Sequence, residues 1–424
     1  MRGSKSVKKL WRDGLRLLSG SGAAFVAQGL AFLLLARVLG PEEYGKYVVI
    51  VATFNFLAPA LADGIGSLAL ARIAGGRSAP PEALGLSIST ILVVGTLGVA
   101  IAFLVSVAVP GLPYQDGTVP NLAAACLVLF PLSVACEKVL QACSRFGVGS
   151  LLRFAREALR LAAAIMFALV GPSTLRSWSA YYVATGCVVS TVSIVACASI
   201  TRGIELAWPS MNDLRESLPF AVGSQARTLN TDIDKVLLGV LVGPAVTGVY
   251  AASYRFVSVG QMPVLALLGA SYPRFFRRGA KGIDAAREYA RQLLPAVVGL
   301  AIVCGAVLLA GAPLMPALLG SQYGAGKIMI WSLAAYPVLR GLQYLAGDIL
   351  TGIGEQAQRA RYELETSGLN VALNIALIPI VGWLGAATAT LVSEVTLWLR
   401  LHLWVKAEAE LADEQKASKY ASRP

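Results

Sequence analysis

The chain has 424 residues, of which 56% are hydrophobic and only 14% charged, and its mean hydropathy is +0.66. This composition excludes an ordinary soluble globular protein, because too few polar residues remain to cover the outer faces of its helices. The net charge of +12 would indicate nucleic-acid binding in a soluble protein. Here its distribution along the chain points to membrane topology instead.

Apolar runs of the length that crosses a bilayer recur along the whole chain, each roughly 20 residues or more. They predict about twelve transmembrane helices, six in each half of the chain. The expected spans are 16–38, 46–70, 84–109, 119–142, 149–171, 178–200, 217–242, 246–272, 290–312, 326–350, 363–381 and 383–404. Because little is left for a soluble domain, the expected fold class is an all-α polytopic membrane protein.

Basic residues gather in alternate connecting segments. With the amino terminus inside, the inner segments hold Arg2, Lys5, Lys8, Lys9, Arg12, Arg72, Arg77, Arg145, Arg202, Arg215, Arg274, Arg277, Arg278, Lys281, Arg287, Arg359, Lys406, Lys416 and Lys419. The outer turns hold little beyond Lys46, Arg176 and Lys327. Cytoplasmic loops are enriched in Lys and Arg, so this asymmetry predicts that both termini lie in the cytoplasm. We do not expect a nucleic-acid partner.

Residues for catalysis or metal binding are sparse. The six cysteines fall within or beside apolar runs without metal-ligand spacing, and the only histidine is His402. The segment 320–328 resembles a phosphate-binding loop, but its glycine spacing is wrong and Ile328 replaces the Ser or Thr that would bind magnesium. The sequence therefore predicts no enzyme, no cofactor and no metal site.

A short phrase, G-P-x-x-x-G-x-Y, occurs at Gly40–Tyr47 and again at Gly243–Tyr250, 203 residues later. Other pairs follow in the same order, among them Arg153 with Glu157 and Arg361 with Glu365 at an offset of 208. These matches predict a tandem duplication with halves 1–203 and 204–424. Many transporters consist of two such halves with the substrate site between them.

The segment 217–242 is the most polar of the predicted spans. Arg227, Asn230 or Thr231, and Asp234 share one helix face by their spacing. Arg227 lies ~14 Å from the inner end, near the middle of the hydrocarbon core. A guanidinium there suits a diphosphate. An ion pair with Asp63 or another acid, or a structural arginine solvated by water, is an equally open reading. Gln28 occupies the position in the first half that matches Thr231.

Two internal ion pairs are expected in the second half. Asp234 is expected to pair with Arg255 and so to neutralise both charges within the membrane. Arg340 and Glu394 lie at similar depth on two other spans and form the second expected pair. In the alternative reading, Glu394 is a proton or cation site, since a buried carboxylate can exchange protons near neutral pH.

Several stretches resemble a known family. They are Leu35–Gly45, Asp63-Gly64-Ile65-Gly66, Asp234–Gly239, Gly248-Val249-Tyr250, Leu319-Gly320 with Tyr323, Leu377-Ile378-Pro379 and Gly382–Ala387. In this order and spacing the chain resembles bacterial polysaccharide and O-antigen flippases. These proteins form a branch of the multidrug/oligosaccharidyl-lipid/polysaccharide exporter superfamily.

The resemblance implies two six-helix bundles of MATE-like fold, which open alternately to either side of the bacterial cytoplasmic (inner) membrane. It implies a polyprenyl-diphosphate-linked oligosaccharide as substrate, moved to the outer leaflet for O-antigen or exopolysaccharide synthesis. Membrane lipids, a polysaccharide polymerase and other assembly proteins would be partners. The expected substrate contacts are Arg227, Gln28, Asn230, Thr231 and Arg340.

Two other functions stay open at this point. A cation-coupled small-molecule or multidrug exporter on the same scaffold would need an exposed, titrating Glu394 or Asp63. A membrane partner of a polysaccharide synthase that transports nothing would lack a polar central cavity. Arg227 at mid-membrane depth favours the flippase over both.

Overall fold

Helices make up all regular structure in the described part of the chain. The computed structural model describes the backbone of residues 2–56, 58, 60–108 and 117–421. Within these ranges the side chains are described except at 2–21, 60–61, 222–224, 226–227, 229–230, 412–413 and 415–421. The contacts divide the chain into two compact units, Met1–Asp232 (unit 1) and Ile233–Pro424 (unit 2). The duplication into 1–203 and 204–424 stays a prediction.

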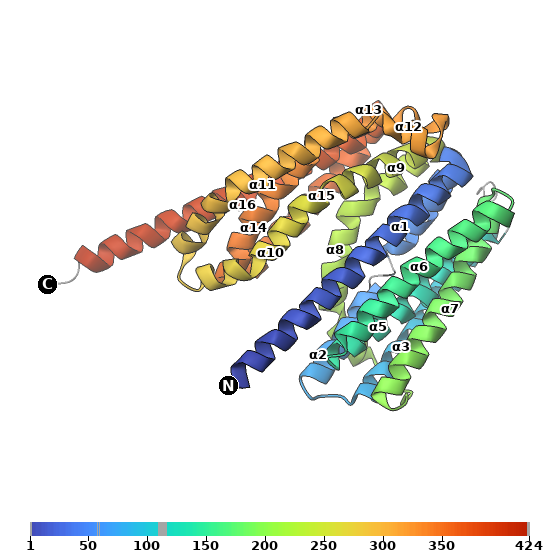
Figure 1. Cartoon of the computed structure of the whole chain (residues 1–424), viewed down its shortest axis with the longest axis horizontal. Helices are drawn as coiled ribbons and strands as arrows, with labels where there is room; N and C mark the ends of the chain where they lie inside the picture. The colour runs from blue at the N-terminus through green and yellow to red at the C-terminus, as the bar shows by residue number, and fades with distance from the viewer. Residues whose placement is uncertain (1, 57, 59, 109–116, 422–424) are drawn as a thin grey trace. The chain divides into compact units, whose positions relative to one another are not determined.

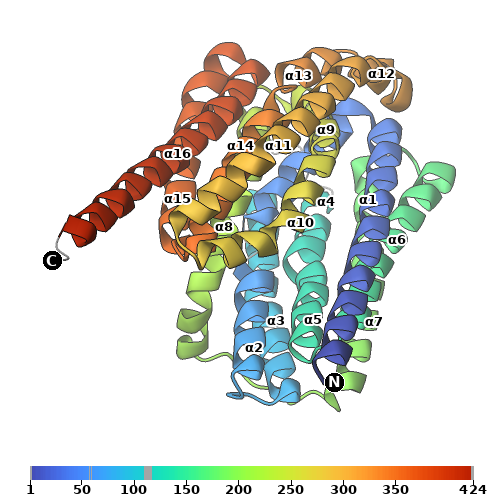
Figure 2. The same ribbon diagram turned by 60° about the vertical axis from the view of Figure 1, so that its left-hand side comes forward.

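Unit 1 is built from long helices with two π-helical stretches. Its elements are α1 (Arg2–Asn55), η1 (Ala60–Ile65), α2 (Gly66–Ala74), α3 (Pro80–Ala108), α4 (Thr118–Ala124), η2 (Ala125–Leu129), α5 (Phe130–Ala142), α6 (Phe146–Val170), α7 (Leu175–Thr201) and the first part of α8 (Met211–Leu241). The helix α1 packs along α6, and α5 contacts α2, α6 and α7 (Figures 1 and 2). Small and aliphatic residues of α3, α5 and α7 form its core, among them Leu84, Leu140 and Cys197.

Unit 2 repeats the pattern of long helices joined by short turns. Its elements after α8 are α9 (Pro244–Gly260), α10 (Met262–Gly279), α11 (Ile283–Gly311), α12 (Leu314–Leu319), η3 (Ser321–Tyr323), α13 (Gly326–Ser332), α14 (Tyr336–Ile353), α15 (Gln356–Val381) and α16 (Trp383–Ala421). The helix α14 lies against α10, α11 and α16, as Figure 1 shows. The core around it includes Val297, Leu350 and Leu401.

The fold class predicted from the sequence is confirmed. By length and composition, six helices of the described residues can cross a membrane, or seven if the bent pair α9–α10 is one span. The helices α6, α8, α14 and α16 correspond to further expected spans but carry charged or polar side chains. Exposed side chains such as Leu97 and Leu104 of α3 give the surface the apolar character that lipid contact requires.

Proline residues explain where two expected spans are broken. The run 246–272 divides at Gln261 into α9 and α10, which are bent by 45°. The run 326–350 divides into α13 and α14. Pro263 and Pro337 stand in the first turn of the second helix in each case. Proline fits that position because the missing N–H has no helical partner there, whereas further inside it interrupts the hydrogen-bond ladder.

The repeated phrase has the same local geometry in both copies. Gly40 has φ 71° and Gly243 has φ 122°, both in the region that favours glycine. Each is followed by proline at the start of a helical turn, Pro41 after the kink in α1 and Pro244 at the start of α9. The turn that the sequence predicted between two apolar helices is therefore present at both places.

Helices of unit 2 approach each other backbone to backbone. A Cβ atom at Gly279 of α10 would lie 2.2 Å from the carbonyl oxygen of Gly352 in α14. A Cβ atom at Gly352 would in turn lie 2.6 Å from the carbonyl oxygen of Phe275. Small residues allow such close packing of membrane helices, where dispersion contacts replace the hydrophobic driving force. The two glycines therefore fix the contact of α10 with α14.

A charged cluster joins α2 to the start of α8 in unit 1. Arg72 lies 2.7 Å from a carboxylate oxygen of Asp213 and 2.9 Å from one of Glu216. Asp213 also accepts hydrogen bonds from the backbone N–H and the hydroxyl of Ser210, at 2.8 and 2.6 Å. These contacts place the first turns of α8 with unit 1. Burial alone would raise the pKa of Asp213, but the hydrogen bonds from Ser210 and Arg72 hold it below its ordinary value.

Because of this cluster, we expect the wild-type protein to lose more stability on acidification than an Asp213→Asn variant loses. The pKa of Asp213 is lower in the folded state, so its stabilising contribution is present above the unfolded pKa of about 3.9 and is lost as the pH falls through the folded value. The midpoint of thermal unfolding should therefore fall more for wild type than for Asp213→Asn between neutral pH and pH about 3. Equal falls would contradict this role.

Candidate functional site

Arg340 of α14 and Glu394 of α16 form an ion pair inside unit 2. This is the contact that the sequence predicted. The Arg340 side chain keeps 23% of its surface exposed, whereas Glu394 keeps only 4%. One carboxylate oxygen of Glu394, Oε2, is buried without a hydrogen-bond partner in the described part of the chain. The Arg340 guanidinium is therefore the more accessible member of the pair, and Oε2 of Glu394 remains able to accept a hydrogen bond.

Aromatic rings surround this pair and extend it toward α8. The guanidinium of Arg340 lies 5.1 Å from the ring centroid of Tyr344 and 5.9 Å from that of Tyr336. The hydroxyls of Tyr336 and Tyr254 are 3.1 Å apart, and Lys235 Nζ lies 4.7 Å from the Tyr254 ring. Cation–π contacts of this kind stabilise a cation without neutralising it. A track of cations and tyrosines thus runs through unit 2.

The expected pair of Asp234 with Arg255 is wrong. Asp234 instead accepts hydrogen bonds from the hydroxyl of Tyr250 at 3.0 Å and from Lys235 Nζ at 3.3 Å. Tyr250 and Arg255 are five residues apart on α9, so they point about 140° away from each other around the helix axis. Because the fully buried Tyr250 faces Asp234, Arg255 faces elsewhere.

The other end of the track holds a second buried cation. Arg359 of α15 lies 3.1 Å from an oxygen of Asp348 and 2.9 Å from one of Glu363, and it donates to the Thr351 hydroxyl at 2.9 Å. Its charge is therefore balanced by two carboxylates. Arg340, which has one carboxylate and greater exposure, is the better placed of the two to meet an anion.

A cluster that the sequence reasoning missed occupies unit 1. It consists of Glu137 of α5 and of Arg153, Arg156, Glu157 and Arg160 of α6. Arg156 lies 2.6 Å from Glu137 and 3.3 Å from Glu157, and Arg153 lies 3.2 Å from Glu137. Arg160 lies 3.2 Å from Glu157. Three arginines share two carboxylates, so the cluster keeps one positive charge in excess.

Arg160 is the member of this cluster that meets aromatic rings. Its guanidinium carbon lies 5.2 Å from the centroid of Phe130 and 5.4 Å from that of Tyr182. The Tyr182 ring in turn lies 5.8 Å from that of Tyr47, the last residue in the first copy of the repeated phrase. The sequence does contain a pattern from which this cluster could have been predicted. Arginines three and four residues apart occur within the apolar run 149–171, and such spacing places them on one helix face.

The other predicted site residues are spread over unit 1 and α8. Gln28 is half-buried on α1, and Thr231 is exposed on α8. Asp63 lies in η1, where a carboxylate oxygen is 3.4 Å from Lys138 Nζ of α5. Arg227 and Asn230 belong to α8, but their side chains lie outside the described residues. Lys138 therefore supplies a counter-charge for Asp63.

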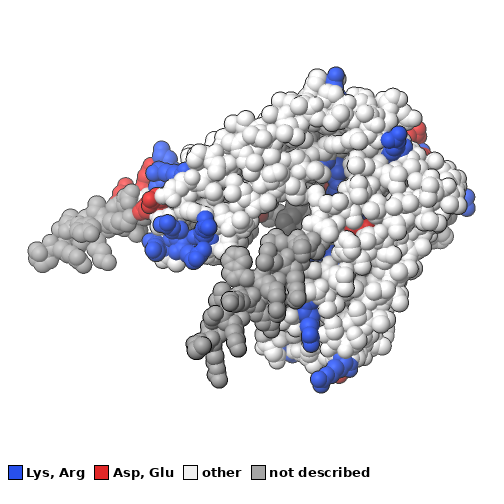
Figure 3. All heavy atoms as spheres, viewed as in Figure 1, with Lys and Arg blue, Asp and Glu red and all other residues white. Residues whose placement is uncertain are grey.

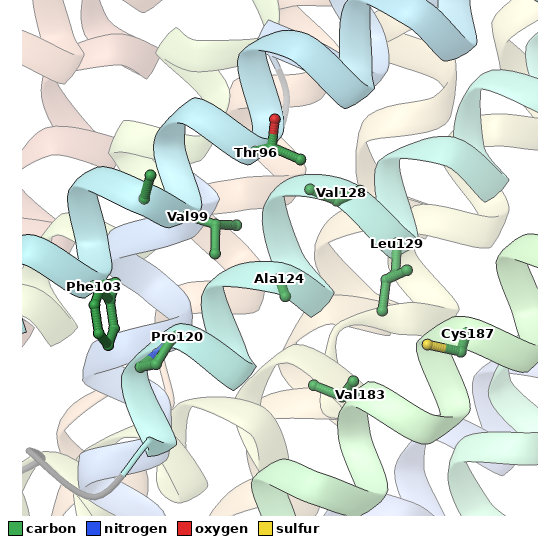
Figure 4. Close-up of a pocket in the computed structure, with 10 residues that line it drawn as sticks. Thr96, Val99, Phe103, Pro120, Ala124, Val128, Leu129, Val183 and Cys187 are labelled. Atoms are coloured by element: carbon green, nitrogen blue, oxygen red, sulfur yellow. The ribbon is translucent and has the colours of Figure 1, made fainter.

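A large cavity of unit 1 is almost entirely apolar, with the Thr96 hydroxyl as its polar side-chain group. It has a volume of about 540 Å³ and lies among α3, α4, η2 and α7. Figure 4 shows Phe103, Pro120, Leu129, Val183 and Cys187 around it. Such a lining can hold hydrocarbon but contains no cationic side chain that would balance the charge of a phosphate.

The part of the chain that the structure describes contains no group of three His, Cys, Asp or Glu side chains suited to a metal ion. The charged groups that it does bring together are arginine–carboxylate clusters flanked by tyrosines. In the membrane such groups act as internal ion pairs or as contacts for a charged cargo. These clusters are chemically suited either to internal ion pairing or to contact with a charged ligand.

Comparison with known families gives one match. The family model described as polysaccharide biosynthesis protein matches residues 10–278, which is more than half of the chain. The comparison with curated proteins gave no match. The matched region covers unit 1, α8, α9 and most of α10.

Solved structures show which fold the chain shares. An inward-facing MATE multidrug transporter of the MOP superfamily aligns with a TM-score of 0.73 at 15% identity, over 91% of this chain and 95% of the other. An outward-facing structure of such a transporter gives 0.64 at 16% identity, over 93% and 95%. A MOP superfamily transporter from Pyrococcus furiosus gives 0.62 at 15% identity, over 93% and 95%. At these identities the likeness is one of fold.

Proposed function

Because the chain belongs to the polysaccharide biosynthesis protein family, we propose that it is a flippase for a polyprenyl-diphosphate-linked oligosaccharide. It carries this lipid from the cytoplasmic to the outer leaflet by alternating access, for the synthesis of O-antigen or exopolysaccharide. The family match is the observation that carries the proposal. The fold supports a membrane transporter, since its structural relatives are transporters and not enzymes.

The arginine clusters give this proposal a physical basis. A diphosphate that crosses a low-dielectric region needs compensating positive charge, and guanidinium binds phosphate oxygens with two parallel hydrogen bonds. Arg340 is partly exposed and has one carboxylate partner. Arg160 belongs to a cluster with an excess of positive charge. We propose these two with Arg227 as contacts of the diphosphate, and Gln28, Asn230 and Thr231 as contacts of polar groups nearby.

The sugar and the lipid of the proposed substrate need different kinds of contact. Hydroxyl groups need hydrogen-bond partners, which the tyrosines along the track in unit 2 can provide. The polyprenyl chain needs only apolar surface and can remain among the membrane lipids while the head group crosses. No covalent step is required, so catalysis by the chain is not part of the proposal.

A second candidate function is export of a small molecule coupled to a cation. Its specific support is the fold shared with multidrug transporters. Glu394 does not meet the exposure that this function needs, since its side chain is 4% exposed and paired with Arg340. In that case Glu394 or Asp63 would exchange an ion during transport. Both carboxylates have a cation beside them, but the Asp63 side chain is 38% exposed, so Asp63 is the better placed of the two to exchange an ion.

The same proposal places the protein in the bacterial inner membrane with both termini in the cytoplasm. The basic residues of the inner segments support this orientation. The lipid-linked oligosaccharide would then reach the outer leaflet, where a polysaccharide polymerase would use it. We therefore expect the protein to co-purify with such a polymerase.

We expect Arg227→Ala to abolish transport while leaving the protein inserted in the membrane. Removing a mid-membrane cation should cost the diphosphate its compensating charge, whereas Arg227→Lys keeps the charge and should retain part of the activity. The readout is lipid-linked oligosaccharide that accumulates in cells carrying each variant, at matched protein levels. Unchanged transport in Arg227→Ala would remove Arg227 from the proposed site.

A further inference from the structure

Unit 2 contains a second cavity that the flippase proposal does not use. It has a volume of about 180 Å³ and is lined by residues of α11, α14 and α16. Figure 1 shows the course of these three helices. Its apolar wall includes Leu294, Leu342, Ile349 and Trp398. Its polar wall consists of Arg287, Arg291 and His402. A pocket with hydrocarbon on one side and cations on the other matches an amphipathic ligand.

The cavity lies where two helices change from polar to apolar. In α11, Asp284, Arg287, Glu288 and Arg291 are followed by an uncharged stretch from Leu293 to Gly311. In α16 the mainly apolar part, which also contains Glu394 and Arg400, ends near Trp404, and Lys406 begins a charged stretch. Such a transition marks the boundary between hydrocarbon and head groups, where tryptophans are also enriched. The cavity therefore lies at the level of lipid phosphates.

The two arginines lack carboxylate partners. Arg287 and Arg291 are four residues apart, so they share one face of α11. Among the side chains that the structure describes, none forms an ion pair with either of them. The nearby Glu288 instead accepts a hydrogen bond from Gln292 on its own helix, at 3.2 Å. Two adjacent guanidinium groups without counter-charge are arranged to receive an anion.

His402 and Trp398 complete the wall on α16. Their rings lie 5.9 Å apart, and both border the cavity. The indole ring offers a flat apolar surface for an acyl chain, and the imidazole offers a hydrogen-bonding edge near the arginines. Lys and Arg side chains also gather near the turn between α10 and α11 (Figure 3). Arg277 and Arg278 of this surface are not among the residues that line the cavity.

We propose that this cavity binds a membrane phospholipid with an anionic head group. Arg287 and Arg291 hold its phosphate, and one acyl chain lies against Leu294, Leu342 and Trp398. The charge complementarity of the two unpaired arginines selects this ligand over a zwitterionic lipid, because both guanidinium groups can share the phosphate and the head group carries no cation that would repel them. The site is separate from Arg340 and its tyrosines, and the proposal does not depend on which cargo the protein transports.

The experiment measures lipids that stay bound after purification from a defined mixture. The protein is reconstituted in equal amounts of phosphatidylglycerol and phosphatidylcholine, extracted with detergent, and examined by native mass spectrometry. We expect wild type to retain phosphatidylglycerol, and Arg287→Gln/Arg291→Gln to lose at least about tenfold of that retention. The matched control Arg277→Gln/Arg278→Gln removes two exposed cations from the neighbouring helix and should retain the lipid.

Two outcomes would overturn the proposal. Equal retention by wild type and Arg287→Gln/Arg291→Gln would show that the arginines do not hold the lipid, and equal loss in the control would reduce the effect to general surface charge. A polyprenyl diphosphate is added in a parallel sample. If it displaces phosphatidylglycerol from wild type and is itself lost with Arg287→Gln/Arg291→Gln, the site belongs to the transported lipid instead. Monodisperse elution and helical circular dichroism confirm that each variant is folded.

Discussion

Replacing Arg340 by leucine should destabilise unit 2 strongly. It leaves Glu394, with 4% of its side chain exposed, as a buried carboxylate without its counter-charge. Removing one partner of a buried pair typically costs about 3–5 kcal/mol, because the remaining charge has lost both water and its partner. The midpoint of thermal unfolding in detergent should fall accordingly for Arg340→Leu.

The double variant Arg340→Leu/Glu394→Leu separates stability from transport. Replacing both charges by apolar groups of similar size should recover most of the lost stability. Arg361→Ala is the matched control, since its ion pair with Glu365 lies on the surface and should contribute little. If the stable double variant transports normally, Arg340 is structural. If it is stable but inactive, the pair takes part in transport, either through Arg340 as a contact of the cargo or through Glu394 as an ion site.

Glu137→Ala should have a comparable effect in unit 1. Glu137 is 7% exposed and lies within 3.2 Å of both Arg153 and Arg156. Without it, three arginines share the single carboxylate of Glu157, and the unfolding free energy should fall by about 3–5 kcal/mol. The measurement is again the decrease in the midpoint of thermal unfolding in detergent.

The control for this second prediction is Arg153→Ala. Half of the Arg153 side chain is exposed, so solvent screens its interaction with Glu137 and the loss should be small. It also lowers the excess positive charge of the cluster. A midpoint that falls as far for Arg153→Ala as for Glu137→Ala would show that the cluster is not held together by its buried carboxylate.

Features set by local sequence were predictable. Long apolar runs predicted the helices, and the glycine–proline phrase predicted the turns at Gly40 and Gly243, because only a few residues tolerate positive φ before a helix start. The contact of Arg340 with Glu394 followed from matched depths on two helices. Depth is readable from a sequence since each residue adds ~1.5 Å along the axis.

Contacts that depend on how a helix is rotated about its axis, or on which helices pack together, could not be predicted from the sequence. Asp234 and Arg255 lie at compatible depths, but the direction in which each side chain points depends on how α9 turns against α8. Tyr250 faces Asp234, and Arg255 does not. The cluster around Arg156 shows the same limit. Its arginines were visible in the run 149–171, whereas the contribution of Glu137 depends on α5 packing against α6.

The most direct test of the central claim is the leaflet distribution of lipid-linked sugars in cells that lack this gene, with drug susceptibility measured in parallel. The flippase account predicts polyprenyl-linked oligosaccharide that accumulates on the cytoplasmic leaflet, with unchanged drug tolerance. Restoring the gene should restore the distribution. A normal glycolipid distribution together with heightened drug sensitivity would contradict the account and would identify the protein as a small-molecule exporter.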